Sequence, residues 1–529
     1  MSALIAAVLF TTLTNPCTQK PSEAVPQPDT GDVALLEHAI CLARSDKNSP
    51  AYLLGAIAIR YAGLGQFDRA FELANSIDDE GERDLVRARI ATSLNKSGET
   101  KRAIEILTSI QLFVETDGRK VPRYKSFITG EIAEQFAACG AFDRVFEVAL
   151  STDEDYLKRV ALDAILDNFV IKQDFETLAK VVEASATLGN GEDGVIVSSV
   201  AQKYAEAGQY QKAITVANSL ARTRDDFDDF NRDDAITNIA LLLAKRGDFT
   251  RAVNLADSTD DYFKSQALIQ IAKEQIAKGQ SDAGVRLLVR VTSPLLKERY
   301  EEPDFDDAGI GAQRLAGAGV AYASAGYRDK AEKLLAIALD RAKRVRKFTE
   351  RDQAIREVAV AYAEAGMFEQ AADAARPDNF SYFKIAPLAD VAIEMLRQHR
   401  DTEVREVVTM IRELRVKERS ELQADALAEI AIKYLELGDR KSAAEVLTAA
   451  FEIARNAPVN DFQPGTMGKM AVALAEAGEY TKAIEVVAEI KSKFHQTLAL
   501  AEIGVVQVKV GWVPDAHTMK ILNGPQREE

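Results

Sequence analysis

Small and aromatic residues recur at fixed distances from a glycine along most of the chain. In one representative stretch, small Ala58 and aromatic Tyr61 precede Gly65, and aromatic Phe67 and small Ala70 follow it. Residues spaced three and four apart share one face of an α-helix. Glycine readily adopts the left-handed backbone conformation that ends a helix. The pattern therefore predicts two short helices joined by a turn at Gly65.

The same pattern returns as far as the C-terminus, and it predicts thirteen equivalent turns: Gly65, Gly98, Gly140, Gln173, Gly208, Gly247, Gly279, Gly326, Gly366, His399, Gly438, Gly478 and Gly511. Self-similarity at such a period is typical of a helical solenoid. The sequence thus predicts an all-α fold, a right-handed α-α superhelix of about 13 helix-turn-helix repeats, with about 26 repeat helices and no β-sheet.

Two positions in each repeat carry small side chains. Seven residues before the turn, twelve of the thirteen copies have Ala or Gly, and Leu166 is the exception. Five residues after the turn, ten copies have Ala or Gly. Small residues that face each other allow two helices to approach closely. We therefore expect these two positions to meet across each helical hairpin.

These offsets resemble the tetratricopeptide repeat. The order of that repeat appears here as Ile57-Ala58, Tyr61, Gly65, Phe67 and Ala70, and it returns as Ala201, Tyr204, Gly208, Tyr210 and Ala213. The resemblance covers residues 51 to about 520. The early Trp of the family is replaced by Leu or Ile, its closing Pro is missing, and the intervals between turns run from 32 to 47 residues. The resemblance implies a protein-interaction module.

The spacing of the turns also indicates how the chain is organised. A unit of three repeats, 106 to 120 residues long, is copied about four times. The repeats occupy residues 51–522, and an amphipathic helix in 31–50 is predicted to cap the first of them. Residues 1–30 are predicted to be a signal peptide and a disordered spacer, and 523–529 a disordered tail.

The prediction of a signal peptide rests on the apolar run at residues 3–13, which is too short to span a membrane. It favours export to the periplasm or cell envelope, although no Lys or Arg precedes the run. The alternative is a cytoplasmic protein with an apolar tail. Residues 13–17 resemble a bacterial lipoprotein box, so membrane attachment is expected only through a lipid on Cys17.

Charge and residue usage narrow the classes of function. The 66 basic and 82 acidic residues give a net charge of −16, which opposes nucleic-acid binding. The four histidines are scattered and indicate neither a metal site nor a cofactor, and no small-molecule substrate is evident. Cys41 and Cys139 lie in different predicted layers, roughly 20 Å apart by helix dimensions, and both are expected to be unpaired core residues.

Two functions remain. The first is a non-catalytic scaffold that binds a partner peptide or helix on a concave surface. The alternative is a helical-toroid enzyme or accessory domain acting on glycans. Such an enzyme needs two carboxylates at a defined separation, whereas the acids here are distributed by repeat and the chain has one Trp, Trp512.

The resemblance implies that the first helix of each repeat faces the concave groove, and that the residue six before the turn points into it. In the last six repeats this residue is always β-branched and apolar: Val320, Val360, Ile393, Ile432, Val472 and Val505. In the first seven it is mostly polar: Ile59, Thr92, Glu134, Asp167, Gln202, Leu241 and Lys273. Four residues further along lie Glu364, Glu436 and Glu476.

We name these six apolar positions the apolar strip. An apolar strip facing solvent commonly marks an interaction site, and the glutamates would favour a partner with basic flanks. The alternative is a superhelix wound so tightly that the strip is buried between repeats, and this alternative is favoured.

Overall fold

The fold is described from a computed structural model of the chain. The structure describes residues 33–116, 119–169, 175–186, 188, 192–220, 226–297, 307–376, 385–414, 420–457 and 463–523. The predicted signal peptide, Cys17 and the turn residue Gln173 lie outside these residues.

Within the described ranges the chain forms α1 (Ala34–Ser45) followed by alternating first and second helices of the repeats. The first helices are α2 (Pro50–Gly63), α4 (Glu80–Lys96), α6 (Ser126–Ala138), α8 (Asp155–Asn168), α10 (Glu192–Glu206), α12 (Asp226–Arg246), α14 (Asp261–Ala277), α16 (Asp307–Ser324), α18 (Phe348–Glu364), α20 (Ile385–Arg397), α22 (Ser420–Glu436), α24 (Gln463–Ala477) and α26 (Lys493–Val510). The second helices are α3 (Phe67–Asn75), α5 (Thr100–Ser109), α7 (Phe142–Leu150), α9 (Phe175–Ser185), α11 (Tyr210–Ser219), α13 (Phe249–Ala256), α15 (Ser281–Lys297), α17 (Arg328–Arg344), α19 (Phe368–Ala375), α21 (Asp401–Glu413), α23 (Arg440–Arg455), α25 (Tyr480–Glu489) and α27 (Ala516–Asn523).

The predicted turns are confirmed by the backbone. Twelve of the thirteen anchor residues have positive φ, including His399 at 56°, which stands where the other eleven are glycines. At Gly65 the amide of Gln66 donates to the Tyr61 carbonyl at 2.9 Å, and that of Gly65 to Ala62 at 3.0 Å. This paired arrangement is the Schellman motif, which satisfies the last carbonyls of a helix. The chain is therefore the predicted tetratricopeptide-like α-solenoid.

The small positions meet within the hairpins, as predicted. Every residue seven before a turn is buried, and so is every residue five after a described turn except Ala516 in the last repeat. A Cβ added to Gly284 of α15 would lie 2.8 Å from the carbonyl oxygen of Ala272 on α14. Real Cβ atoms do not approach backbone so closely, so the separation of the two helices requires glycine at this position.

Glutamines near the start of several first helices connect successive repeats, a feature that the sequence did not suggest. Fifteen residues before their turns, these side-chain amides donate to carbonyls at the end of the preceding second helix. Gln463 donates to Ala454 at 2.8 Å, and Gln496 donates to Val487 at 3.2 Å. Each of these carbonyls also accepts from a backbone amide just beyond its helix, Ala454 from Ala457 at 3.1 Å and Val487 from Ile490 at 3.1 Å. The glutamines therefore add a second hydrogen bond that crosses the junction between repeats.

The expectation of no β-sheet is wrong. Strands β1 (Phe113–Thr116) and β2 (Arg119–Pro122) form an antiparallel hairpin between α5 and α6, with Val114 opposite Val121. The two residues between the strands are Asp117-Gly118, a pair typical of tight hairpins. This local signal was present in the sequence, but the helical period of the surrounding repeats obscured it.

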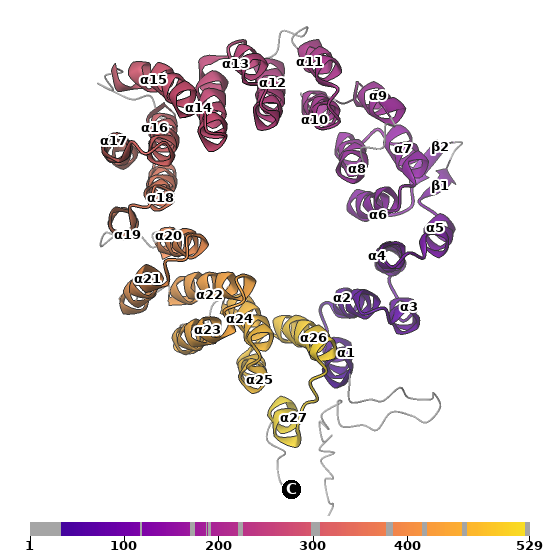
Figure 1. Ribbon diagram of the computed structural model, residues 1–529. Coiled ribbons are helices and arrows are strands. Elements are labelled where there is room, and N and C mark those ends of the chain that lie inside the picture. The colour runs from indigo at the N-terminus through magenta and orange to yellow at the C-terminus, as the bar shows by residue number, and fades with distance from the viewer. Residues whose placement is uncertain are drawn as a thin grey trace, which may run out of the picture.

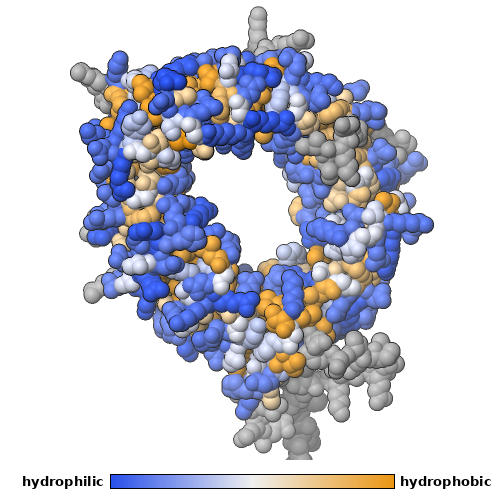
Figure 2. All heavy atoms as spheres, viewed as in Figure 1, coloured by the Kyte–Doolittle hydropathy of each residue, from blue (hydrophilic) through white to orange (hydrophobic). Residues whose placement is uncertain are grey.

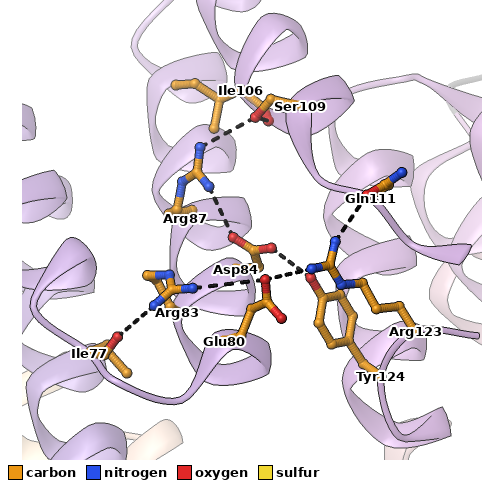
Figure 3. A network of polar contacts seen from close by, with 10 residues as sticks. All are labelled: Ile77, Glu80, Arg83, Asp84, Arg87, Ile106, Ser109, Gln111, Arg123 and Tyr124. Atoms are coloured by element: carbon orange, nitrogen blue, oxygen red, sulfur yellow. Dashed lines mark hydrogen bonds and ion pairs between the residues drawn. The ribbon is translucent and has the colours of Figure 1, made fainter. Parts of the chain in front are cut away.

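A polar network joins this hairpin to the helices (Figure 3). After β2, Arg123 donates to Glu80 of α4 at 2.7 Å, and the Tyr124 hydroxyl donates to Asp84 at 2.7 Å. Asp84, 7% exposed, also pairs with Arg87 at 3.0 Å. Burial and the hydrogen bond to Asp84 raise the pKa of Tyr124. The buried carboxylate is thus satisfied from two directions, which holds the hairpin exit against α4.

The repeats curve into a closed ring around a central opening (Figures 1 and 2). First helices line the inside and second helices form the outside. The ring closes where α1, at one end of the chain, packs against α26 at the other, and α2 also contacts α26. The second helix α27 packs against α25. Consequently, α1 occupies the place beside α26 that a second helix occupies in the other repeats.

The prediction for the cysteines is confirmed at one position and wrong at the other. Cys139 is a free, buried thiol, whereas Cys41 is disulfide-bonded. The layer spacing excluded only a bond between these two residues, so it could not establish that Cys41 was unpaired. Separately, no helix in the described part of the chain is both long and apolar enough to span a membrane.

The turn residues provide a matched pair of stability predictions. His399 adopts a left-handed conformation that side chains disfavour by about 1 kcal/mol or more. We expect His399→Gly to stabilise the protein by about 1 kcal/mol, and Gly438→Ala to destabilise it by a similar amount. The φ of Gly438 is 84° and a Cβ there would have open space around it, so the loss would be purely conformational. Thermal melting of both variants tests this, and a lower melting temperature for His399→Gly would contradict it.

Candidate functional site

The inner face of the ring is built from equivalent positions of the first helices. Positions nine, six and two before the turn are three and four residues apart, so they form one stripe on each helix. Because the first helices stand side by side around the opening, these stripes combine into a continuous inner wall. The apolar strip and the three glutamates predicted to flank it belong to this wall.

The sequence left open whether the apolar strip faces solvent or is buried between repeats, and the structure places it between these two arrangements. Val320 is 7% exposed and belongs to the core. Val360, Ile393, Ile432, Val472 and Val505 are half-buried, and Ile432 and Val472 pack against the core while keeping part of their surface exposed. The strip is thus neither a free ridge nor wholly buried.

Three strip residues meet in one hollow of about 560 Å³ on the inner wall. Val320 of α16, Val360 of α18 and Ile393 of α20 contribute its apolar part, together with Ala316, Gly317 and Ala361. Gly317 stands where neighbouring first helices have larger residues, and its missing side chain leaves room. Ile432, Val472 and Val505 continue the strip on α22, α24 and α26 outside this hollow.

Charged residues surround the apolar part of the hollow. Arg356 forms an ion pair with Asp390 on the next first helix, and Arg397 pairs with Glu394 at 3.0 Å. The hydrogen bond to Asp390 raises the pKa of Arg356. Glu364 also lines the hollow, is exposed, and has no ion-pair partner among the described residues. Lys273 and Glu357 line the hollow as well, so its four carboxylates exceed its three cationic side chains by one.

The other two glutamates predicted to flank the strip differ from each other. Glu436 pairs with Lys433 of its own helix at 2.7 Å. The side chain of Glu476 is exposed to solvent overall. Neighbouring atoms still desolvate its carboxyl enough to raise the pKa, whereas the positive charge of Lys509 lowers it. Only Glu364 lies in the same hollow as strip residues.

Ion pairs between neighbouring first helices form a ladder around the inner wall. Its members are Arg89–Glu131, Arg356–Asp390, Lys469–Asp425, Lys469–Glu429 and Arg60–Glu502. Six of these residues stand nine before their turns. Sequence reasoning missed the ladder, although the charges at this position were visible. It could not show that the charges of successive repeats alternate in space, since that depends on the register between helices.

The ladder leaves some carboxylates in excess. Burial raises the pKa of Glu429, the nearby charge of Asp425 raises it further, and Lys469 acts in the opposite direction. Lys469 lies 2.9 Å from Asp425 and 3.9 Å from Glu429, so one ammonium serves two acids. In the described ranges, no group of three or more His, Cys, Asp or Glu residues is arranged to hold a metal ion.

No protein-family model matches the chain, and the comparison with curated proteins finds no match. Among solved structures, the chain is similar to the APC/C hetero-tetramer Cut9-Hcn1, with 13% identity over 91% of this chain and 94% of that chain and a TM-score of 0.23. It is also similar to the pentatricopeptide repeat protein PPR10 from maize, with 13% identity over 86% of this chain and 77% of that chain and a TM-score of 0.25. For Ton1535 from Thermococcus onnurineus NA1 the identity is 14% over 62% of this chain and 95% of that chain, and the TM-score is 0.22. Likeness at this level transfers no function to the chain.

The raised pKa of Glu429 predicts a pH-dependent effect on stability. A carboxyl whose pKa is raised by folding stabilises the folded state while it is protonated, and this contribution is lost as the pH rises through the raised value. At pH 7 the ionised, half-buried group is therefore unfavourable. We expect Glu429→Gln to raise the melting temperature at pH 7 and to have little effect near pH 4.

Glu485→Gln is the control, because Glu485 is exposed on the outer helix α25. Melting curves of both variants between pH 4 and pH 8 make the comparison. A lower melting temperature for Glu429→Gln at pH 7 would show that its attraction to Lys469 outweighs its burial.

Proposed function

We propose that the protein is a non-catalytic scaffold whose inner face, from α16 to α26, binds an apolar segment of a protein partner that carries basic flanks. The observation that carries this proposal is the hollow where Val320, Val360 and Ile393 meet beside Glu364. Half-buried aliphatic side chains gain further burial when a partner covers them, at roughly 25 cal/mol per Å². The excess of one carboxylate in the hollow favours a cation next to the buried group.

The size of the ring determines how such a partner lies. Packed helices stand 8–10 Å apart, so about thirteen first helices surround an opening roughly 25 Å wide after allowance for their side chains. A single partner helix is about 10–12 Å across and cannot fill it. A partner helix or extended segment would therefore lie against one side of the wall, which agrees with an apolar strip confined to the last six repeats.

The charge of the protein supports a basic partner. The net charge of −16 attracts cationic segments and repels nucleic acid. The ladder supports a role without catalysis, because its carboxylates are spread over the repeats and face Arg or Lys across the junctions. A glycan-cleaving site would instead place two carboxylates on either side of one bond.

The binding test uses a defined probe, a fluorescent amphipathic peptide of Leu and Lys. We expect saturable binding in fluorescence anisotropy that weakens with salt, whereas the Leu and Glu counterpart and single-stranded RNA should not bind. The double variant Val360→Asp with Ile393→Asp should weaken binding at least tenfold with little change in melting temperature, because these side chains are already half-exposed.

The matched control is Ile59→Asp with Leu241→Asp, at the same position in the first half of the ring. Both control side chains are also half-buried, and Leu241 packs against the core as Ile432 and Val472 do. The control should therefore lower the melting temperature but leave binding intact below it. Equal loss in both double variants, or binding by the Glu peptide, would rule out the proposed surface. The parallel variant Ile432→Asp with Val472→Asp should reduce binding and also stability, since these residues pack against the core.

We also propose that the protein is exported, with cytoplasmic residence as the alternative. The apolar run at residues 3–13 supports export, as does the disulfide-bonded Cys41, because disulfides persist in oxidising compartments. Protein isolated from its source should begin at or after about Thr14, as determined by mass spectrometry of its N-terminal peptide. Recovery of intact Met1 from the cytosol would overturn this proposal.

A further inference from the structure

One junction of the ring differs from all the others. Successive repeats are joined by the chain, which passes from each first helix through its second helix to the next. The helices at the closing junction, α26 and α1–α2, come from opposite ends of the chain and contact one another only through space. The ion pair Arg60–Glu502 at this junction joins residues 442 apart in sequence.

The closing junction has the same kinds of contact as the linked ones. The buried amide of Leu35 donates to Gln507 Oε1 at 3.3 Å. The rings of Tyr52 and Phe494 stack with centroids 5.6 Å apart. Gly504 allows a close approach, because a Cβ there would lie 2.8 Å from Leu36 Cγ and 3.1 Å from the Leu36 amide nitrogen. The junction is therefore specific, although no covalent link joins its residues in the part of the chain that the structure describes.

Helix α1 belongs to the N-terminal side of this junction. Glu37 accepts hydrogen bonds from the Tyr61 hydroxyl at 2.8 Å and from Arg69 of α3. In the connection to α2, Asp46 accepts from the amides of Asn48 at 2.9 Å and Ser49 at 2.8 Å. These contacts and the short connection at residues 46–49 tie α1 to α2 and α3, so an opening must break the more extensive packing of α1 against α26. If the ring opens, α1 moves with them, and the surface that separates is the one facing α26.

We propose that the ring opens between α26 and α1–α2, and that this opening is the entrance through which a partner reaches the inner face. In a solenoid each repeat contacts only its neighbours, so loss of one junction leaves the others intact. At a linked junction the short chain connection limits separation. At the closing junction the two ends can part freely and return at high effective concentration. The role as an entrance rests on the proposed function, but the opening does not.

Native-state hydrogen exchange tests the opening without any partner. We expect peptides from α1 and α26 to exchange through a partial opening, at urea concentrations below those that unfold α4, α6, α18 and α20. Gly504→Val should speed this exchange by about tenfold, since its Cβ collides with Leu36. The matched control is Gly319→Val, where a Cβ would meet Leu335 Cγ at 2.8 Å within the linked α16–α17 hairpin.

The control should speed exchange in α16 and α17 and leave α1 and α26 unchanged. The proposed opening would be overturned if α1 and α26 exchanged only when the whole chain unfolds, in both the wild type and Gly504→Val.

A cross-link tests the entrance. The closing junction is sealed by a short bismaleimide that joins two introduced cysteines, Arg60→Cys and Glu502→Cys. Both are made in a Cys139→Ala background. Arg89→Cys with Glu131→Cys, joined in the same way, is the control at a linked junction. The probe is the Leu and Lys peptide fused between two folded domains, each too wide for an opening roughly 25 Å across.

The sealed ring should bind the free peptide but take up the two-domain probe at least tenfold more slowly than the control cross-link. Equal uptake by both cross-linked proteins would overturn the entrance. Failure of the free peptide to bind the uncross-linked ring would instead reject the proposed function, while the exchange experiment still decides whether the ring opens.

Discussion

The whole structure depends on the close approach of two helices within each hairpin. Wherever a first helix crosses its second helix, a small residue seven before the turn lies opposite another five after it in most repeats, and both are buried. An added methylene in such a contact typically costs about 1–3 kcal/mol because well-packed interiors cannot absorb it. Since most repeats obey this constraint, most hairpins have a similar shape. Similar units stacked in one direction produce a regular curvature.

Regular curvature allows the chain to close into a ring, and the packing of α1 against α26 closes it. The last repeat places α27 against α25, which leaves the outer side of α26 for α1. Gly504 occupies the position that is Ala in most repeats, and its missing Cβ accommodates the Leu36 backbone. An open solenoid exposes an apolar face at each end. In this ring the two end faces cover each other.

Closure also shapes the chemistry of the inner wall. First helices that converge on the inside bring their polar stripes close together, so charges at equivalent positions form ion pairs across the junctions. Partial burial of these stripes makes surplus carboxylates such as Glu429 easier to protonate. The apolar strip lies in the same wall, and the half-burial of its side chains reflects the same convergence. A partner would therefore meet a surface that is apolar along one line and charged on either side.

The sequence by itself determined what depends on residues near one another in the chain. The turn at Gly65, the small pair at Ala272 and Gly284, and the alternation of first and second helices all follow from offsets within one repeat, where backbone sterics and helix periodicity act locally.

Only the tertiary structure decided the rest. The pairing of Arg60 with Glu502 and the seating of Leu36 on Gly504 depend on the small angle between repeats, summed around the ring, and no single repeat encodes that sum. The register between neighbouring helices decided that Arg356 faces Asp390 and that Val320, Val360 and Ile393 share one hollow. Register arises from packing between repeats, so a pattern within each repeat does not contain it.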